Sequence, residues 1–361
     1  MKQFLNFNSL IQSKKISGWG RKSFVESKFL KLESEQGIKD FIKGSYTSSL
    51  ITRGLGRSYG DAAQLKEDFI LNVNFSQSIS ISGNQLTVGG GVSIEKVLEV
   101  IVPLGYFLPV SPGSAKVTIG GAIAADVHGK NHHKDGSLGN HVSRILLIDG
   151  RGDIQELKPI QNSSGKSNNF FWATIGGMGL TGIILEATIS LIKIDTSFIK
   201  ADTFICKDLD ELLELMKSKD KEYSYSVAWV DSLHKKTRGV LTCGEHARLE
   251  DLDNITSNHL FYDSKNLGSA PNLFPNGLLN KFTVKAFNEL WFRKSSTMGN
   301  NIQTISQFFH PLDGISNWNR IYGSQGFYQY QFVVPNDKSY FISKTLDLSL
   351  IHISEPTRQA T

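Results

Sequence analysis

The sequence predicts a protein of the α+β class, in which helices are combined with largely antiparallel sheets. Short apolar runs of strand type alternate with helical segments through the first half of the chain. Two pairs of these runs are joined by tight turns, at Gly83-Asn84 and at 149–152, which is the pattern of antiparallel hairpins. After about residue 195, aromatic and turn residues become more frequent, which indicates a second structural unit.

Local signals place the individual elements. In chain order the pattern predicts a strand at 29–32, a helix at 35–42, a strand at 50–52, a hairpin at 78–88, a helix at 93–104, a hairpin at 145–157, a strand at 182–194 and a strand-to-helix unit at 203–216. Ser93 can cap the second helix, and Gly105 can end it.

The chain divides into four segments, with the main boundary near 195–197. We expect residues 1–16 to be an N-terminal extension, 17–195 a first domain and 196–347 a second, partial domain. Residues 348–361 resemble the translation of a sequencing adapter. We therefore expect this tail to be non-native, and the natural protein to continue past about Asp347.

Composition narrows the function classes. The 361 residues are 40% hydrophobic and 20% charged, as in a globular protein of about two domains. The net charge of +5 has no dense basic stripe, which argues against nucleic acid and suits a phosphate-bearing substrate or an anionic membrane. Cys206 and Cys243 are the only cysteines, so we expect no disulfide framework, no CxxC metal site and a cytoplasmic location. No signal peptide or spanning run is seen, so membrane contact would be peripheral, at the inner face.

The first chemistry-bearing segment is the glycine-rich loop Arg53-Gly-Leu-Gly-Arg-Ser-Tyr-Gly-Asp61. Its glycines follow a predicted strand and expose consecutive backbone N–H groups, which can form an anion-binding concavity. Arg57 and Ser58 add donors suited to a diphosphate. Taken alone, the loop is better interpreted as a glycine-rich surface turn, and it lacks the Gly-Lys-Ser/Thr of a Walker loop.

The second segment runs from Thr118 to His133. Gly120 and Gly121 open a stretch of mostly small residues, which lets the backbone approach a large flat ligand. A polar cluster follows, made of His128, Lys130, Asn131, His132 and His133. A zinc site is a rival interpretation, but Gly129 and Asn131 argue against one continuing helix and no HExxH pattern is present, so no metal is expected.

The third segment contains a literal GxGxxG pattern at 177–182. A dinucleotide fingerprint requires a strand before the glycines and a helix after them. Here a predicted helix precedes the glycines and a predicted strand follows, so the Rossmann interpretation is rejected. A turn that brings backbone against a cofactor fits better.

Together these segments resemble the FAD-binding domain of the vanillyl-alcohol-oxidase (PCMH-type) superfamily. Within it, the chain from about Ser17 to about Pro335 is similar to the decaprenylphosphoryl-β-D-ribose 2-oxidase family. The stretches that carry this resemblance are Trp19-Gly-Arg21, 53–61, His128-Gly-Lys-Asn-His-His133, Phe171-Trp-Ala-Thr174, Phe274-Pro-Asn-Gly277, Glu289-Leu-Trp-Phe-Arg-Lys294, His310-Pro-Leu-Asp313 and Gln329-Tyr-Gln331. The stretch at 128–133 is the most specific of them, whereas the glycine-rich loops identify only the superfamily.

The resemblance implies a PCMH-type FAD-binding domain of two α/β subdomains over 17–195, and a substrate domain with an antiparallel sheet after it. At the pyrophosphate it implies Arg53, Gly54, Leu55, Gly56, Arg57, Ser58, Tyr59, Gly60 and Asp61. Along the flavin it implies Gly113, Thr118, Ile119, Gly120, Gly121, Ala125, Asp126, Val127 and His128, and at the adenine end the backbone of Ile184. Relatives with covalent flavin have histidine at the position of Arg57, so we expect non-covalent FAD.

The implied reaction is oxidation of the ribose 2′-hydroxyl of a polyprenyl-phosphoryl-β-D-ribose to a ketone, the first half of an epimerisation to the arabinose lipid. The expected catalytic residues are His128, Lys130, Tyr59 and Gln331. The expected substrate-pocket residues are Trp229, Phe309, Gln329 and Gln331. The family usually has tyrosine where this chain has Phe309, and core packing stays an equal interpretation for Trp229 and Phe309. The expected partner is a short-chain dehydrogenase that reduces the keto product.

Two alternative functions stay open. A sugar-alcohol or aldonolactone oxidase of the same superfamily would share the glycine-rich segments. A non-catalytic, truncated FAD-binding fragment would follow from the adapter-like tail.

Overall fold

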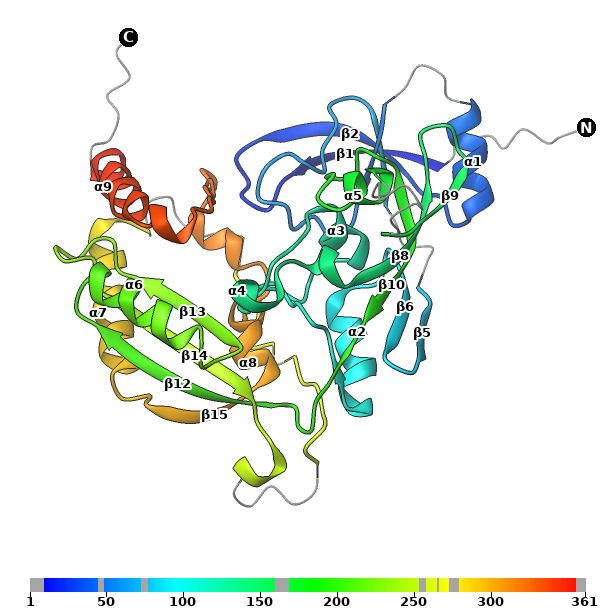
Figure 1. Ribbon diagram of the computed structural model, residues 1–361. Coiled ribbons are helices and arrows are strands. Elements are labelled where there is room, and N and C mark those ends of the chain that lie inside the picture. Colours follow the sequence, from blue (N-terminus) through cyan, green and yellow to red (C-terminus); the bar gives the residue numbers. More distant parts are fainter. Residues whose placement is uncertain are drawn as a thin grey trace, which may run out of the picture.

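The computed structural model describes residues 10–44, 49–72, 77–159, 169–252, 258–264, 266–272 and 279–354. The elements form two halves that lie side by side (Figure 1). The half that ends near residue 194 contains two larger sheets, and the other half contains one sheet with helices packed on it. The fold is of the α+β class, as predicted.

The first sheet has four strands in the order β1-β2-β4-β3. β1 (Ile11–Ser17) and β2 (Phe24–Leu30) are antiparallel, whereas β4 (Phe69–Asn72) is parallel to both β2 and β3 (Leu50–Arg53). The helix α1 (Glu35–Gly44) has an apolar stripe that it buries beside this sheet. β3 leads directly into the glycine-rich loop, so this sheet sets where the loop begins.

The second sheet is antiparallel, with strand order β5-β6-β10-β8-β9. Its strands are β5 (Ile79–Ser82), β6 (Gln85–Gly89), β8 (Val142–Ile148), β9 (Ile154–Leu157) and β10 (Ile183–Ser190). The short helix α3 (Ile119–Ala124) packs across β6 and β10, and the buried face of α2 (Ile94–Ile101) joins the same core. This contact places the small residues of α3 beside the ends of two central strands.

The third sheet belongs to the C-terminal half and is antiparallel, in the order β13-β14-β12-β15. Its strands are β12 (Phe198–Cys206), β13 (Tyr225–Val230), β14 (Gly239–His246) and β15 (Asn300–Thr304). The helices α6 (Leu209–Lys219) and α7 (Lys281–Ser295) pack on it, and α9 (Tyr340–Ser354) lies at one end of this half (Figure 1). Both cysteines are free, buried thiols of this sheet.

The two halves share one hydrophobic core. The buried residues of β6, β8 and β10 are continuous with Phe107, and through it with Tyr225 and with Phe309 of α8 (Ile305–Phe309). Since this core crosses the boundary near residue 195, the halves are held in a fixed relation. The remaining short elements are β7 (Tyr106–Phe107), α4 (His132–Asp135), α5 (Asn169–Thr174) and β11 (Ile192–Lys193).

Most of the predicted elements are confirmed. The Ser93 hydroxyl accepts a hydrogen bond from the Lys96 backbone N–H, and Gly105 ends the following 3₁₀ turn with a φ of 76°. The strand expected at 29–32 instead spans β2, because β1, which was not predicted, pairs along its whole length. The strand expected at 182–194 is broken at Leu191, since β10 pairs with β6 and β8 whereas β11 pairs with β7.

Some sequence features lie outside the described residues. These are the stretch Phe274–Gly277 and residues 1–9 and 355–361. Within the described part of the chain, every helix is too short or too polar to cross a lipid bilayer.

Candidate active site

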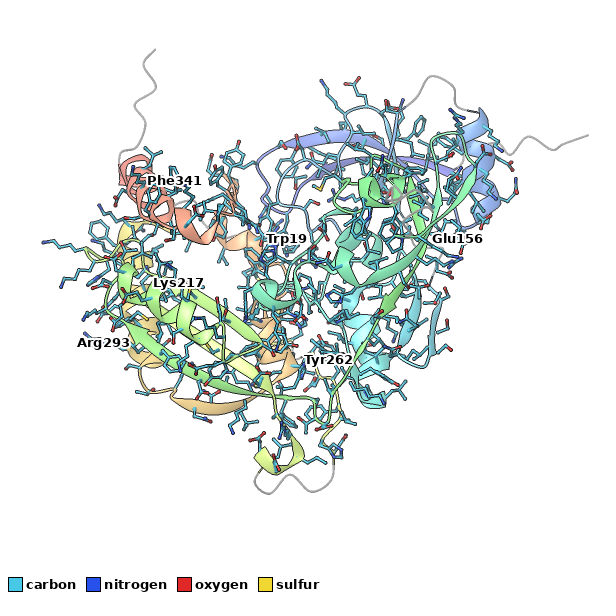
Figure 2. The ribbon with its side chains drawn as sticks, viewed as in Figure 1. Trp19, Glu156, Lys217, Tyr262, Arg293 and Phe341 are labelled. Carbon is cyan, nitrogen blue, oxygen red and sulfur yellow. The ribbon has the colours of Figure 1, made fainter. Side chains whose placement is uncertain are left out.

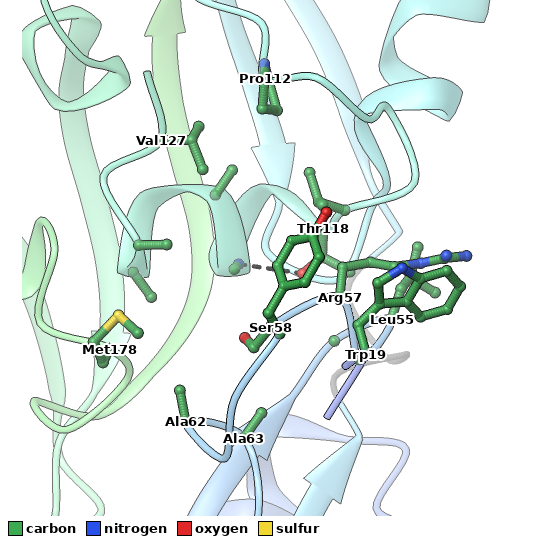
Figure 3. A pocket seen from close by; sticks show the side chains of 18 of the residues that line it. Trp19, Leu55, Arg57, Ser58, Ala62, Ala63, Pro112, Thr118, Val127 and Met178 are labelled. Carbon is green, nitrogen blue, oxygen red and sulfur yellow. Dashed lines mark hydrogen bonds between the residues drawn. The ribbon is translucent and has the colours of Figure 1, made fainter. Parts of the chain in front are cut away.

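A cavity of about 990 Å³ lies where the glycine-rich loop faces α3 (Figure 3). The loop supplies residues 54–61, and the segment around α3 supplies residues between 112 and 128. Turn residues at 178–184 and a distant stretch at 312–333 complete the wall. This volume is at the upper end for small-molecule sites, so the cavity is large enough for an extended ligand.

Backbone atoms form the floor of this cavity. Thr118 caps α3 by accepting a hydrogen bond from Gly121 N at 3.2 Å, and Gly120 N donates to Gly90 O at 2.8 Å. A Cβ atom on Gly90 would lie 2.2 Å from the Ile184 carbonyl oxygen, so only glycine fits there. Three chain segments therefore meet without intervening side chains and leave a flat surface for a ligand.

The glycine-rich loop is held from outside by the segment at 18–20. Trp19 N donates to Ser58 O at 2.7 Å, and Gly20 N donates to Tyr59 O at 3.0 Å. The Arg57 guanidinium carbon lies 3.8 Å from the centre of the Trp19 ring, and the two side chains lie side by side in Figure 3. Burial lowers the Arg57 pKa, and its Nε has no partner among the described residues. Arg57 is therefore a cation with a free buried donor at this wall.

These features fit FAD. Exposed loop N–H groups and the unpartnered Arg57 Nε suit a pyrophosphate, and the small residues of α3 suit a flat ring system. The cavity wall contains Gly54, Leu55, Gly56, Arg57, Ser58, Tyr59, Gly60, Asp61, Gly113, Thr118, Gly120, Gly121, Ala125, Val127, His128 and Ile184 from the set expected to bind cofactor.

Three members of that set lie elsewhere. The Arg53 guanidinium donates to Ser17 O and Ala63 O and lines a second, smaller cavity behind the loop. Ile119 is fully buried in the core beneath α3. The Asp126 carboxylate accepts hydrogen bonds from Ser137 Oγ and Gly139 N, so it holds the turn after α3.

His128 lines the cavity together with residues of the C-terminal half. Its Nε2 lies 3.2 Å from Gln331 Nε2. An amide nitrogen can only donate, so this ring nitrogen accepts and the neutral ring carries its proton on Nδ1. Burial, together with the neighbouring His132, lowers the His128 pKa below 6.5. The geometry brings a neutral imidazole and an amide into one wall, with Gln329 beside them.

Tyr59 lines the same cavity and is enclosed by aromatic rings. Its ring centre lies 5.5 Å from Phe327 and 6.2 Å from Trp318. Burial raises its pKa, so the phenol keeps its proton and can donate but not remove one.

Lys130 turns away from the cavity. Its ammonium donates to Phe308 O at 2.6 Å and lies 4.5 Å from the centre of the Phe308 ring. Burial lowers its pKa to about 8. The nearby His310 is buried, with Nε2 2.9 Å from Ser111 Oγ, and burial lowers its pKa to about 3. Lys130 thus connects α8 to the segment that carries the polar cluster, and His310 connects the end of α8 to the loop at Ser111.

Two residues expected in the substrate pocket are not brought to this cavity. Trp229 is half-buried on β13, within the third sheet. Phe309 is 1% exposed and packs edge-on against Tyr225, with ring centres 4.9 Å apart. Phe309 is therefore positioned by core packing. The family usually has tyrosine here, but the phenylalanine of this chain removes no hydroxyl group from the cavity wall.

The cavity wall also contains residues that were not named individually as site residues from the sequence. They are Trp19, Thr52, Ala62, Ala63, Gly90, Pro112, Ser114, Val117, Ala122, Ala124, Met178, Gly179, Gly182, Leu312, Trp318, Phe332 and Val333. Gly90 had a signal in the run of three glycines after a hairpin, and Met178 and Gly179 had one in the GxGxxG turn. Val333 had no sequence signal, because tertiary contacts bring its segment there: Asp313 binds Ser114 Oγ and Ala115 N, and Asn319 binds Trp19 O.

Among the described residues, no group of three or more His, Cys, Asp or Glu side chains lies close enough together to bind a metal ion. The polar cluster is spread out instead. His133 Nε2 lies 3.2 Å from Tyr223 O, on the side of the third sheet, while His128 faces the cavity.

Comparison with known proteins agrees with this geometry. Residues 28–158 match the FAD binding domain family. The chain is 40% identical over 336 residues to decaprenylphosphoryl-beta-D-ribose oxidase of Mycolicibacterium smegmatis, covering 90% of this chain and 72% of that protein. It is 28% identical over 158 residues to cytokinin dehydrogenase 9 of Oryza sativa, covering 42% of this chain and 29% of the relative. It is 23% identical over 151 residues to D-arabinono-1,4-lactone oxidase of Kluyveromyces lactis, covering 40% of this chain and 27% of that protein.

Proposed function

Because this chain belongs to the decaprenylphosphoryl-β-D-ribose oxidase family, we propose that it oxidises the 2′-hydroxyl of a polyprenyl-phosphoryl-β-D-ribose to a ketone, using FAD. One observation carries the proposal. The relative that is similar over most of the chain has this sugar lipid in its name, and the same similarity includes the stretch that places His128 at the cavity.

The residues that would hold FAD are those of the backbone-lined cavity. The loop at 54–61 and Arg57 would bind the pyrophosphate, and the small residues of α3 would lie against the ring system. Bound FAD supplies the acceptor for the hydride that leaves C2′ of the ribose. The chain's own residues must position the sugar and accept the hydroxyl proton.

We assign the proton acceptor to His128. Its pKa below 6.5 keeps the imidazole neutral at physiological pH, and Nε2 is the basic nitrogen on the side of Gln331. Tyr59 has a raised pKa and remains protonated, so it would donate to a sugar oxygen. Lys130 is committed to Phe308 O and would position the segment rather than remove a proton.

FAD is expected to be bound non-covalently. Residues 54–61 contain no histidine or cysteine, and Arg57 is held against Trp19. Acid precipitation of the yellow protein should leave the flavin absorbance in the supernatant. A yellow pellet would show a covalent bond and contradict this expectation.

Anaerobic flavin reduction tests the activity. FAD-loaded protein should lose its yellow absorbance when polyprenyl-phosphoryl-β-D-ribose is added, and should keep it with the lipid arabinose epimer. Bleaching by a soluble polyol or aldonolactone, without bleaching by the lipid, would favour the second oxidase function instead.

Peripheral membrane binding through α7 is a further part of the proposal. Phe282, Phe287 and Leu290 are 83%, 60% and 70% exposed on this helix. Basic side chains at 281, 285, 293 and 294 are on the same helix and suit an anionic leaflet. The protein should co-sediment with phosphatidylglycerol vesicles, and Phe282→Ser should weaken this. Equal sedimentation of the wild-type and Phe282→Ser proteins would argue against membrane binding through α7.

A keto-reductase of the short-chain dehydrogenase type is proposed as the partner enzyme. The product of the oxidation is a ketone, and net epimerisation requires its reduction from the opposite face. Mixing the two enzymes with the ribose lipid should yield the arabinose lipid, and accumulation of the keto lipid alone would exclude that partner.

A further inference from the structure

A second cavity of about 310 Å³ lies behind the glycine-rich loop. It shares Trp19, Leu55 and Gly56 with the main cavity, so the two spaces are separated by this part of the loop and the Trp19 ring. Trp19 lies at the junction of the two halves in Figure 2. The other described residues that line the second cavity are Ile16, Ser17, Gly18, Arg21, Arg53, Asn272, Asn317, Asn319 and Arg320. The wall is therefore polar, and it is made by segments far apart in the sequence.

Three guanidinium groups line this small space. Arg21, Arg53 and Arg320 are each half-buried, and within the described residues none forms an ion pair and no acidic side chain lines the cavity. Arginine side chains that are partly removed from water without a counter-ion are electrostatically unfavourable. A bound anion would remove that cost.

The arginines also keep donors free. Arg320 Nη1 donates to Ala270 O at 3.1 Å, and Arg21 Nη2 donates to Asn272 Oδ1 at 3.4 Å. Arg53 uses its two terminal nitrogens on backbone carbonyls. All these acceptors are neutral, and each guanidinium has further N–H groups in a planar fork that matches an oxyanion.

Asn319 supplies an independent indication of a ligand. Its side chain is 6% exposed, and its Nδ2 donates to Trp19 O at 2.8 Å. Its Oδ1 has no partner among the described residues. A buried amide oxygen without a donor costs free energy, so a ligand that presents a hydrogen-bond donor such as a hydroxyl group, as well as negative charge, would suit this wall.

We propose that the cavity formed by Arg21, Arg53, Asn319 and Arg320 binds a phosphate-class oxyanion that also carries a hydroxyl group. Inorganic phosphate, in its hydrogen phosphate form, has this chemistry, and so does the phosphoribosyl group of the lipid. The lipid as a source rests on the proposed function, because only then does the neighbouring main cavity receive the ribose. The oxyanion site itself does not depend on that function.

Calorimetric titration of the FAD-loaded protein with inorganic phosphate and with ribose 5-phosphate, in phosphate-free buffer, tests the site. Loading with FAD first excludes binding at the pyrophosphate position. Both probes should bind saturably. Arg320→Gln and Arg21→Gln should each weaken binding by about tenfold or more, because a charge-assisted hydrogen bond is lost. Absence of saturable binding would overturn the proposal.

Arg151→Gln is the matched control. Arg151 lies exposed in the turn between β8 and β9 and is not among the residues that line this cavity. Its substitution should change phosphate affinity by less than about twofold, as expected for a surface site outside this cavity. An equal loss in all three variants would mean that phosphate binds non-specifically, and would also overturn the site.

Steady-state kinetics distinguish the two sources of the oxyanion, which are the lipid and free inorganic phosphate. If the lipid phosphate occupies the cavity, Arg320→Gln raises the KM for the lipid with kcat unchanged, and inorganic phosphate competes with the lipid. If phosphate binds but the lipid KM does not change, the site is a free-phosphate site. If the lipid fails to reduce the flavin at all, the proposed function fails while calorimetry still decides the oxyanion site.

Discussion

The two ends of the segment from Thr118 to His133 differ in what they contact. The first end is α3, whose small residues pack on β6 and β10 and form the cavity floor. The second end leaves the cavity after His128 and binds the other half of the molecule. Ser226 N donates to Lys130 O at 2.8 Å, and Lys130 itself donates to Phe308 O. Sixteen consecutive residues, by count from 118 to 133, thus line the main cavity and then connect the two halves of the molecule.

This difference shows that a cluster of reactive side chains in the sequence does not by itself mark the position of the cavity wall. Of the five polar residues in the cluster at 128–133, only His128 is in the wall of the main cavity among the described residues. Asn131 is buried and its Nδ2 donates to Pro109 O at 2.7 Å, which shapes the turn. The glycines and alanines before them, which carry no reactive group, form more of the site.

The largest expected effect separates His128 from the rest of the cluster. His128→Gln should lower the rate of flavin reduction by about 10²–10⁴-fold, because a general base is lost while the fold is kept. Single-turnover stopped-flow at the flavin band measures this. His132→Gln is the control, since that ring lies 5.6 Å from His128 and outside the wall, and should retain most of the rate. An equal loss in both variants would contradict the assignment.

The pH dependence of flavin reduction tests the same assignment of His128. The His128 pKa is lowered from 6.5 by burial, so the ring becomes protonated only as the pH falls below that value, and a protonated ring cannot accept the substrate proton. The rate of flavin reduction should therefore fall on the acid side below pH 6.5, and this limb should be missing in His128→Gln. A profile that is identical in both proteins would exclude His128 as the titrating group.

The next effect tests the floor of the cavity. Ala125 is exposed at the end of α3 and lines the cavity, so Ala125→Phe adds a ring where the cofactor would lie. The Kd for FAD should rise by about 100-fold, or about 2.7 kcal/mol, with little change in stability. Fluorescence titration of FAD measures it. Ala286→Phe, on the exposed face of α7, should leave the Kd for FAD unchanged. A rise in the Kd of both variants would contradict the position of FAD beside Ala125.

A smaller effect tests the inter-domain connection. Lys130→Met removes an ammonium-to-carbonyl hydrogen bond and should lower the free energy of unfolding by about 1.5 kcal/mol, with FAD affinity unchanged. Urea unfolding and FAD titration measure the two quantities. Lys134→Met, which removes an exposed bond to Ser224 Oγ, should cost less. Loss of FAD binding in Lys130→Met would place Lys130 in the cofactor site instead.

The same lysine predicts a pH effect on stability. Burial lowers the Lys130 pKa from 10.5 to about 8 in the folded protein, so between these values the unfolded chain binds more protons than the folded one. Stability must then rise with pH across this window. The wild-type protein should gain stability from pH 8 toward pH 10.5 relative to Lys130→Met, and a constant difference would contradict the burial of this ammonium.

The smallest effect concerns Phe309. Its ring packs in the shared core, so Phe309→Leu should cost about 1 kcal/mol of unfolding free energy and leave the Kd for FAD and the KM for the lipid within about twofold. Thermal unfolding and steady-state kinetics measure these. A large rise in KM would show that Phe309 contacts the substrate.

The sequence by itself determined the local elements, including the glycine-rich turns that line the main cavity. Hairpins, helix caps and glycine-rich turns depend on neighbours in the chain, so periodicity and residue type were enough to predict them. The loop at 53–61 and the small residues of α3 show a local signal of the same kind, because only small side chains leave the backbone exposed. Taken alone, the loop indicated a surface turn, and the resemblance to the FAD-binding superfamily implied its role at a cofactor.

Only the tertiary structure decided which distant side chains join the site. Trp318 and Val333 reach the cavity because Asp313 binds the segment at 114–115 and Asn319 binds Trp19, contacts that span about 200 residues or more. The same contacts bring Gln331 there, which only the family resemblance had implied. The direction of Lys130, the burial of Phe309 and the three arginines of the second cavity arise in the same way. Such contacts depend on how the shared core brings the two halves together, and local sequence patterns contain no record of that packing.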